Sequence, residues 1–85
     1  MKGYTQKKIQ QAREYAAQIE YRLSNECLLP NFGYADHVTE QDKQKYSEKY
    51  FRYAQEIEQG IHDNNFTIWQ RMNYYLTGES VAFLS

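Results

Sequence analysis

The fold is decided by the stretch TQKKIQQAREYAAQIEYRLSNEC, residues 5–27. Its apolar residues recur at steps of three and four, which is the spacing of one face of an α-helix. These residues are Ile9, Ala12, Ala16, Ile19, Leu23 and Cys27. At ~100° per residue they fall within a stripe roughly 80° wide. A stripe this narrow is typical of a seam along which two helices pair closely, so it predicts a long helix with a helical partner.

The stretch TEQDKQKYSEKYFRYAQEIEQG, residues 39–60, predicts a second helix over about residues 40–59. Thr39 and Asp42 have the spacing of a capping box, in which each side chain accepts from the other residue's backbone N–H. Gly60 can adopt the left-handed conformation that ends many helices. The apolar positions of this helix also share one stripe, and they are Tyr46, Tyr50, Tyr53, Ala54, Ile57 and Ile61.

A third, shorter helix is predicted over about residues 66–77, in the stretch FTIWQRMNYYLTG, where Gly78 ends the pattern. No segment shows the alternation of a β-strand. We therefore expect an all-α protein with a single domain over residues 1–85. Its long antiparallel hairpin (about 5–27 and 40–59) would carry the third helix across one end, and an apolar C-terminal tail would follow.

The connector CLLPNFGYADHV, residues 27–38, is unusually apolar for a link between two helices. Pro30 and Gly33 interrupt the helical pattern. Leu29, Phe32 and Tyr34 are large enough to cover the open end of the hairpin, so we expect this connector to be a structural lid.

The composition indicates a folded protein with a thin core. Only 16 of the 85 residues are Leu, Ile, Val or Phe, but 14 are aromatic and the net charge is −1. Disordered chains are usually poor in aromatic residues and strongly charged. We expect a core built from tyrosine and phenylalanine rings, many tyrosines at its margin, and a homodimer that supplements it. The lack of a signal-like or membrane-spanning stretch favours a cytoplasmic location.

Cys27, Asp36 and His37 are the residue types of a thiol active site. Cys27 also continues the apolar stripe of the first helix, where a buried thiol behaves as a small hydrophobic residue. His37 and His62 lack the spacing of metal ligands. We therefore expect no enzyme, no metal and no cofactor, and a thiol-dependent enzyme at Cys27 is only the second alternative.

The first alternative is a DNA-binding regulator that uses the third helix and the basic N-terminus. Its candidate contacts are Lys7, Lys8, Arg13, Gln70, Arg71 and Asn73. Affinity for phosphates comes from several cations acting together, but the sequence pI is about 6.1. We therefore do not expect nucleic-acid binding.

Several aromatic residues lie off the apolar stripes and need another role. Tyr21, Phe51 and Tyr74 are the clearest cases, and Tyr46 and Tyr50 join them if their stripe is only partly covered. Aromatic residues are favoured in protein interfaces because they bury a large area for little rotamer entropy. We therefore predict a small non-enzymatic protein–protein interaction module, of the kind carried as an accessory protein by a phage or plasmid. It would block or recruit a host protein through an aromatic helical surface.

Overall fold

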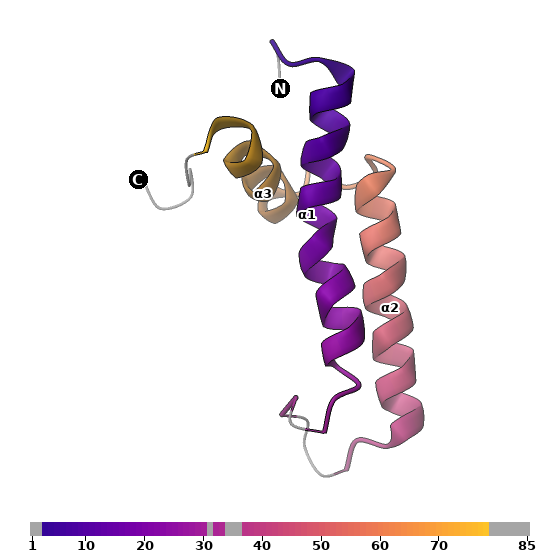
Figure 1. Ribbon diagram of the computed structural model, residues 1–85. Coiled ribbons are helices and arrows are strands. Elements are labelled where there is room, and N and C mark those ends of the chain that lie inside the picture. Colours follow the sequence, from indigo (N-terminus) through magenta and orange to yellow (C-terminus); the bar gives the residue numbers. More distant parts are fainter. Residues whose placement is uncertain (1–2, 31, 34–36, 79–85) are drawn as a thin grey trace.

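The computed structural model describes residues 3–30, 32–33 and 37–78, and these residues form three helices and no strand (Figure 1). The helices are α1 (Gln6–Glu26), α2 (Glu40–Glu58) and α3 (Phe66–Thr77). The prediction of an all-α fold with a long hairpin and a shorter third helix is confirmed. The predicted tail over residues 79–85 lies outside the described residues.

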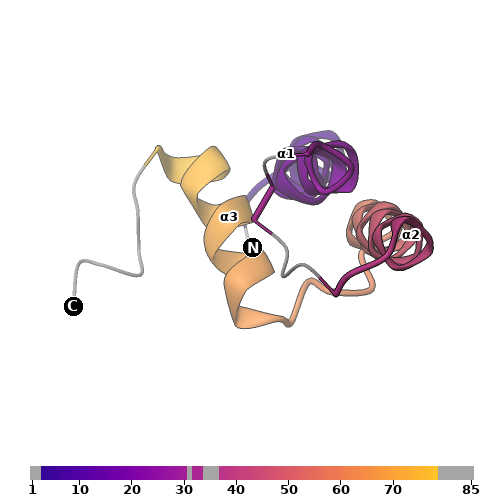
Figure 2. The ribbon, with the colours of Figure 1, turned by 90° about the horizontal axis from the view of Figure 1, so that it is seen from below.

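Helix α1 is the central element of the fold. It runs antiparallel to α2, and α3 crosses it on another side (Figures 1 and 2). The contacts to α3 involve Lys8, Tyr15 and Ala16 of α1, so α3 covers mainly the N-terminal half of this helix. The end of the hairpin that holds the C-terminus of α1 and the N-terminus of α2 is therefore only two helices thick.

The starts of α2 and α3 are fixed by capping side chains. The Thr39 hydroxyl accepts from the Asp42 backbone N–H at 3.1 Å, and the Asp42 carboxylate accepts from the Thr39 N–H at 3.3 Å. This is the predicted capping box. At the start of α3, the Asn65 side chain accepts from two N–H groups of the first turn. Gly78, at φ 74°, ends α3 as predicted.

Gly60 ends α2 in the left-handed conformation, at φ 85°. Its N–H donates to the Ile57 carbonyl at 3.0 Å, and the Ile61 N–H donates to the Glu56 carbonyl at 3.2 Å. This pair of bonds is the Schellman motif that closes many helices. The turn takes Ile61 out of the helical stripe and leaves it 61% exposed, so the prediction that Ile61 continues that stripe is wrong.

The centre of the core is aliphatic, contrary to the prediction of an aromatic core. Its buried hydrophobic residues are Ala12, Ala16, Ala17, Cys27, Ala54, Ile57, Ile68 and Met72. Alanines let facing helices approach so closely that no ring fits between them. Tyr21, Tyr53 and Tyr75 instead pack around the edge of this cluster. Their hydroxyls can reach water or polar partners there, as the prediction of tyrosines at the core margin requires.

Helix α1 buries most of the predicted seam, and it also buries residues beside that seam because it packs on α2 and α3 in two directions. Ile19, a predicted seam residue, is 37% exposed. Glu20 and Ser24 are buried instead. Arg71 contacts the Glu20 carboxylate, and the Ser24 hydroxyl donates to the Tyr21 carbonyl at 2.6 Å, so neither polar group is buried without a partner.

The connector between α1 and α2 covers less of the hairpin than the predicted lid. Leu28 is 38% exposed and Leu29 is 51% exposed. Phe32 is half-buried, and Tyr34 lies outside the described residues. The prediction that Leu29 covers the open end of the hairpin is therefore wrong.

Candidate protein-binding surface

Tyr21 of α1 and Phe51 of α2 meet on one face of the hairpin. Their ring centroids are 5.3 Å apart in an edge-on arrangement, and Phe51 remains 48% exposed. Glu20 and Tyr21 point about 100° apart around α1. The Glu20 carboxylate contacts Arg71 of α3, so the Tyr21–Phe51 pair lies on a different side of α1 from this contact.

The position of the Tyr21 ring is fixed by a hydrogen bond. Its hydroxyl donates to the carboxylate of Glu58 on α2. This bond, together with burial and the negative charge of Glu58, raises the pKa of Tyr21 to about 12. A ring held in this way loses little conformational entropy when a partner covers it.

A shallow groove of about 410 Å³ lies beside Phe51. Its lining residues are Ser24, Asn25, Ser47, Glu48, Phe51, Arg52 and Gln55. Ser24 and Ser47 are the small residues where α1 and α2 lie close, and the Ser47 hydroxyl donates to the Ser24 carbonyl at 2.6 Å. Their short side chains leave the surface hollow, so the groove can accept a side chain of another protein.

The other predicted contact residues do not all join this surface. Tyr74 is 45% exposed, and its ring stacks on Tyr15 with centroids 6.3 Å apart. Tyr15 and Tyr21 point about 120° apart around α1, so Tyr74 belongs to a different face. Tyr46 is 42% exposed and Tyr50 is half-buried. Of the five predicted residues, Tyr21 and Phe51 have rings that contact each other.

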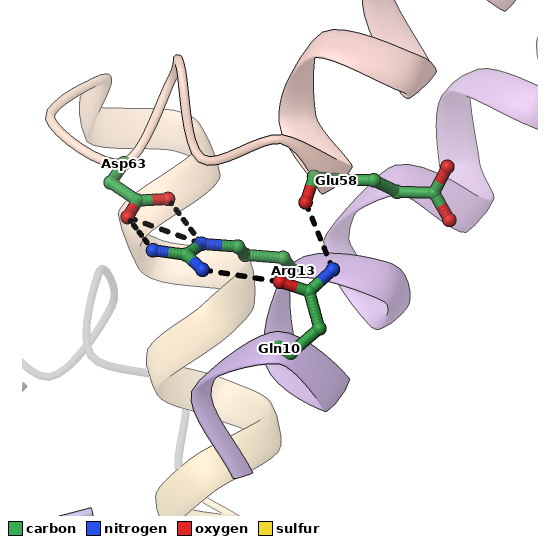
Figure 3. A network of polar contacts seen from close by, with 4 residues as sticks. All are labelled: Gln10, Arg13, Glu58 and Asp63. Atoms are coloured by element: carbon green, nitrogen blue, oxygen red, sulfur yellow. Dashed lines mark hydrogen bonds and ion pairs between the residues drawn. The ribbon is translucent and has the colours of Figure 1, made fainter. Parts of the chain in front are cut away.

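Arg13 and Gln10 of α1 join a polar network that ties α1 to the end of α2 and the following connector (Figure 3). The Arg13 guanidinium donates to Asp63 from Nε at 3.1 Å and from Nη2 at 2.7 Å. Gln10 accepts from Arg13 Nη1 at 3.1 Å and donates to the Glu58 backbone carbonyl at 2.9 Å. The bond to Asp63 also raises the pKa of Arg13, so this side chain stays charged.

The remaining residues of the nucleic-acid alternative are partly committed to internal contacts. Arg71 donates to the Ala16 carbonyl at 3.2 Å and to the Glu20 carboxylate at 3.4 Å. The Lys8 ammonium lies 4.8 Å from the centroid of the Tyr75 ring. Lys7 is exposed, whereas Gln70 and Asn73 are half-buried. Both arginines of the predicted basic set therefore have carboxylate partners within the chain.

Cys27 is fully buried. Its thiol lies 3.5 Å from the Ser24 carbonyl, His37 is exposed, and Asp36 lies outside the described residues. His62 contacts Glu56 at 2.9 Å, and its ring lies 4.5 Å from that of Tyr53, so it packs on the end of α2. Within the described part of the chain, no three His, Cys, Asp or Glu residues are grouped so that they could hold a metal ion.

Sequence reasoning missed the exposure of Ile61, Phe66 and Trp69. The sequence pattern predicts that Ile61 lies on the apolar stripe of the second helix. Phe66 lies about 120° from Met72 around α3, a signal that it cannot share the buried face with that residue. The three residues are 61%, 67% and 37% exposed, respectively.

None of the described helices is long and apolar enough to span a membrane. No protein family, curated protein or solved structure matches this chain significantly.

Proposed function

We propose that this protein is a small non-enzymatic protein–protein interaction module that acts through the Tyr21–Phe51 face of its helical hairpin. The observation that carries this proposal is the half-exposed Phe51 ring, which rests on a Tyr21 ring held by Glu58. The surface occupies a complementary site on a partner protein and thereby blocks or recruits that partner. An accessory protein of a phage or plasmid, acting on a host protein in the cytoplasm, would work in this way.

The energetic argument starts from Phe51. When a partner covers this half-exposed aromatic side chain, apolar area is removed from water. Each Å² of apolar area removed contributes roughly 25 cal/mol of favourable free energy. Rigid aromatic anchors next to a pocket are the usual centres of binding energy in protein interfaces. Glu48, Arg52 and Gln55 line the groove with polar groups that can form the rim of such an interface.

We also propose that the protein forms a homodimer. Among the described residues, only four fully buried side chains are larger than alanine, and one end of the hairpin is two helices thick. Small domains with so little core often gain stability by oligomerisation. Sedimentation equilibrium at high micromolar concentration tests this proposal, because a fully helical species that stays monomeric would contradict it.

The proposed function is tested by pull-down from host lysate with Phe51→Ala and Tyr21→Ala. Phe66→Ala is the matched control, since it removes the same kind of ring from an exposed position outside this surface. The proposal expects a protein that the wild type and Phe66→Ala retain and that both surface variants lose. Far-UV circular dichroism shows whether each variant is folded. If nothing captured depends on Phe51, the proposal fails.

The DNA-binding alternative has less support, because Arg13 and Arg71 are paired with Asp63 and Glu20. DNA affinity that falls steeply between low and moderate salt would favour it.

The thiol-enzyme alternative requires a reactive Cys27. Full burial argues against it, since a reactive thiolate needs access to substrate. Cys27→Ser that leaves the function intact would remove this alternative.

A further inference from the structure

The groove beside Phe51 carries two opposite charges, Glu48 and Arg52, which are the charged residues among those that line it. Both side chains are exposed, and neither forms an ion pair with any residue that the structure describes. They lie four positions apart on α2, which is roughly 6 Å along the helix axis. Each charge can therefore pair with a residue of another molecule that covers the groove.

This arrangement of charges is complementary to itself. In an interface between two identical chains related by a two-fold axis, residue i of one copy contacts residue j of the other, and j contacts i. Suppose that α2 of one copy runs antiparallel to α2 of a second copy, with the axis midway between positions 48 and 52. Glu48 of each copy then faces Arg52 of the other copy, and two ion pairs form across the axis. The charge pattern therefore fits a second copy of this chain.

The position of Phe51 suits the same axis. Phe51 lies one position from the midpoint between Glu48 and Arg52, so the two Phe51 rings meet close to the axis. Each ring also reaches the groove of the other copy, where Ser24 and Ser47 have short side chains. Protein interfaces commonly have an aromatic centre that is surrounded by a polar and charged rim. Phe51 would supply that centre, and the two ion pairs would form part of the rim.

The groove lies towards the end of the hairpin that is only two helices thick (Figure 1). Ser24 and Asn25 lie in the last turn of α1, and Ser47 lies in the N-terminal half of α2. Helical domains are usually built from two packed layers around one core. Two hairpins that pack face to face supply the second layer to each other and form a four-helix bundle. A second copy therefore adds the layer that α3 does not supply at this end.

We propose that two copies of this chain associate through the Tyr21–Phe51 surface as an antiparallel four-helix bundle, in which Glu48 of each copy pairs with Arg52 of the other. This inference rests on the proposed function, since it uses the same surface and the homodimer proposed there. The dimer covers Phe51, so a second copy and a host protein compete for this ring. The monomer is then the form that binds the host protein, and self-association sets how much of that form is present.

The test is sedimentation equilibrium of the full chain, with variants that reverse one charge of the groove. Glu48→Arg and Arg52→Glu should each weaken the dimer at least about tenfold, because each places like charges opposite one another in both ion pairs. An equimolar mixture of these two variants should form a heterodimer, since the two grooves then carry opposite charges. The double variant Glu48→Arg/Arg52→Glu should dimerise about as tightly as the wild type, because it only exchanges the two ends of each ion pair.

Lys49→Glu is the matched control, because it reverses an exposed charge of α2 that points about 160° away from Phe51. It should leave the dimer unchanged, whereas Phe51→Ala, the second variant if a charge reversal does not fold, should weaken it at least about tenfold. Circular dichroism shows whether each variant is folded.

The proposal is overturned if the wild type is monomeric at high micromolar concentration, or if folded Glu48→Arg and Arg52→Glu dimerise as tightly as the wild type. It is also overturned if Lys49→Glu weakens the dimer as much as they do, or if their mixture associates no more tightly than either variant alone. This assay contains no host protein. It can therefore fail while the pull-down succeeds, and the pull-down can fail while the assay succeeds, so the two proposals fail separately.

Discussion

The guanidinium group of Arg13 lies so close to Gly60 that a Cβ atom at Gly60 would come within 3.1 Å of it. The same guanidinium holds Asp63 through two nitrogen atoms (Figure 3). One arginine of α1 therefore fixes both the end of α2 and the connector to α3. Gly60 meets two requirements at once, since it has a positive φ and leaves room for Arg13.

Gly60→Ala should lower the free energy of unfolding by about 2 kcal/mol. Roughly 1 kcal/mol comes from placing a Cβ in the left-handed conformation, and the remainder from displacing Arg13 off Asp63. Gly78→Ala is the matched control, because Gly78 has φ 74° and no atom of the described residues lies within 4 Å of the added Cβ. Gly78→Ala should therefore lower the free energy of unfolding by only about 1 kcal/mol, the part due to the left-handed conformation. Urea denaturation measures both variants, and equal losses would show that the Arg13 contact does not matter.

The ion pair between Arg13 and Asp63 should contribute more than an ordinary surface pair. Its side chains are 22% and 32% exposed, and two guanidinium nitrogens engage the carboxylate. A double-mutant cycle with Arg13→Gln and Asp63→Asn should give a coupling energy of about 1 kcal/mol. The Lys43–Glu40 pair, whose carboxylate is 84% exposed, should give about 0.3 kcal/mol. Similar coupling in both cycles would contradict the argument.

Removing one partner of the buried pair between Glu20 and Arg71 should be worse than removing both. Arg71→Ala leaves the carboxylate of Glu20, a residue only 7% exposed, without its guanidinium partner, and should cost about 2 kcal/mol. The double variant Glu20→Met/Arg71→Met fills the same space with apolar atoms and should unfold within about 1 kcal/mol of the wild type. Thermal and urea unfolding measure both. A double variant less stable than Arg71→Ala would contradict this account.

The helices were predictable because their signals are local. The Thr39–Asp42 capping box and Gly60 act within one turn of the chain, so they mark helix ends without knowledge of the fold. The polar residues on the buried face of α1 were not predictable in the same way. Glu20 is buried because Arg71, which is 51 positions away, reaches it, and no local pattern contains that contact.

The candidate site was predictable residue by residue but not as a surface. Tyr21 and Phe51 were identified because they lie off the apolar stripes. Which of the aromatic residues outside the apolar stripes contact each other depends on how α1 and α2 are rotated about their axes. That rotation follows from small residues where the two helices meet, such as Ser24 and Ser47. For Phe66 the sequence holds a local signal, since it lies about 120° from the buried Met72 around α3. How much of the ring stays exposed depends also on where α3 crosses α1, which is a tertiary feature.

The stability of the protein should fall at alkaline pH in a way that depends on Tyr21. Its hydrogen bond to Glu58 raises the pKa of Tyr21 to about 12 in the folded protein, from an ordinary value of 10.0. In the unfolded chain the phenol loses its proton near pH 10, so between pH 10 and about 12 the folded state binds more protons than the unfolded state. The contribution of this bond is therefore complete below pH 10 and is lost as the pH rises towards about 12.

Tyr21→Phe keeps the ring beside Phe51 but removes the proton, and so tests this linkage directly. It should be less stable than the wild type at neutral pH, and the difference should shrink as the pH rises above about 10. Tyr74→Phe is the control, because the Tyr74 hydroxyl makes no hydrogen bond to any described residue. Urea unfolding between about pH 8 and 11 measures all three proteins. A gap between the wild type and Tyr21→Phe that does not change with pH would mean that Glu58 does not hold the Tyr21 proton.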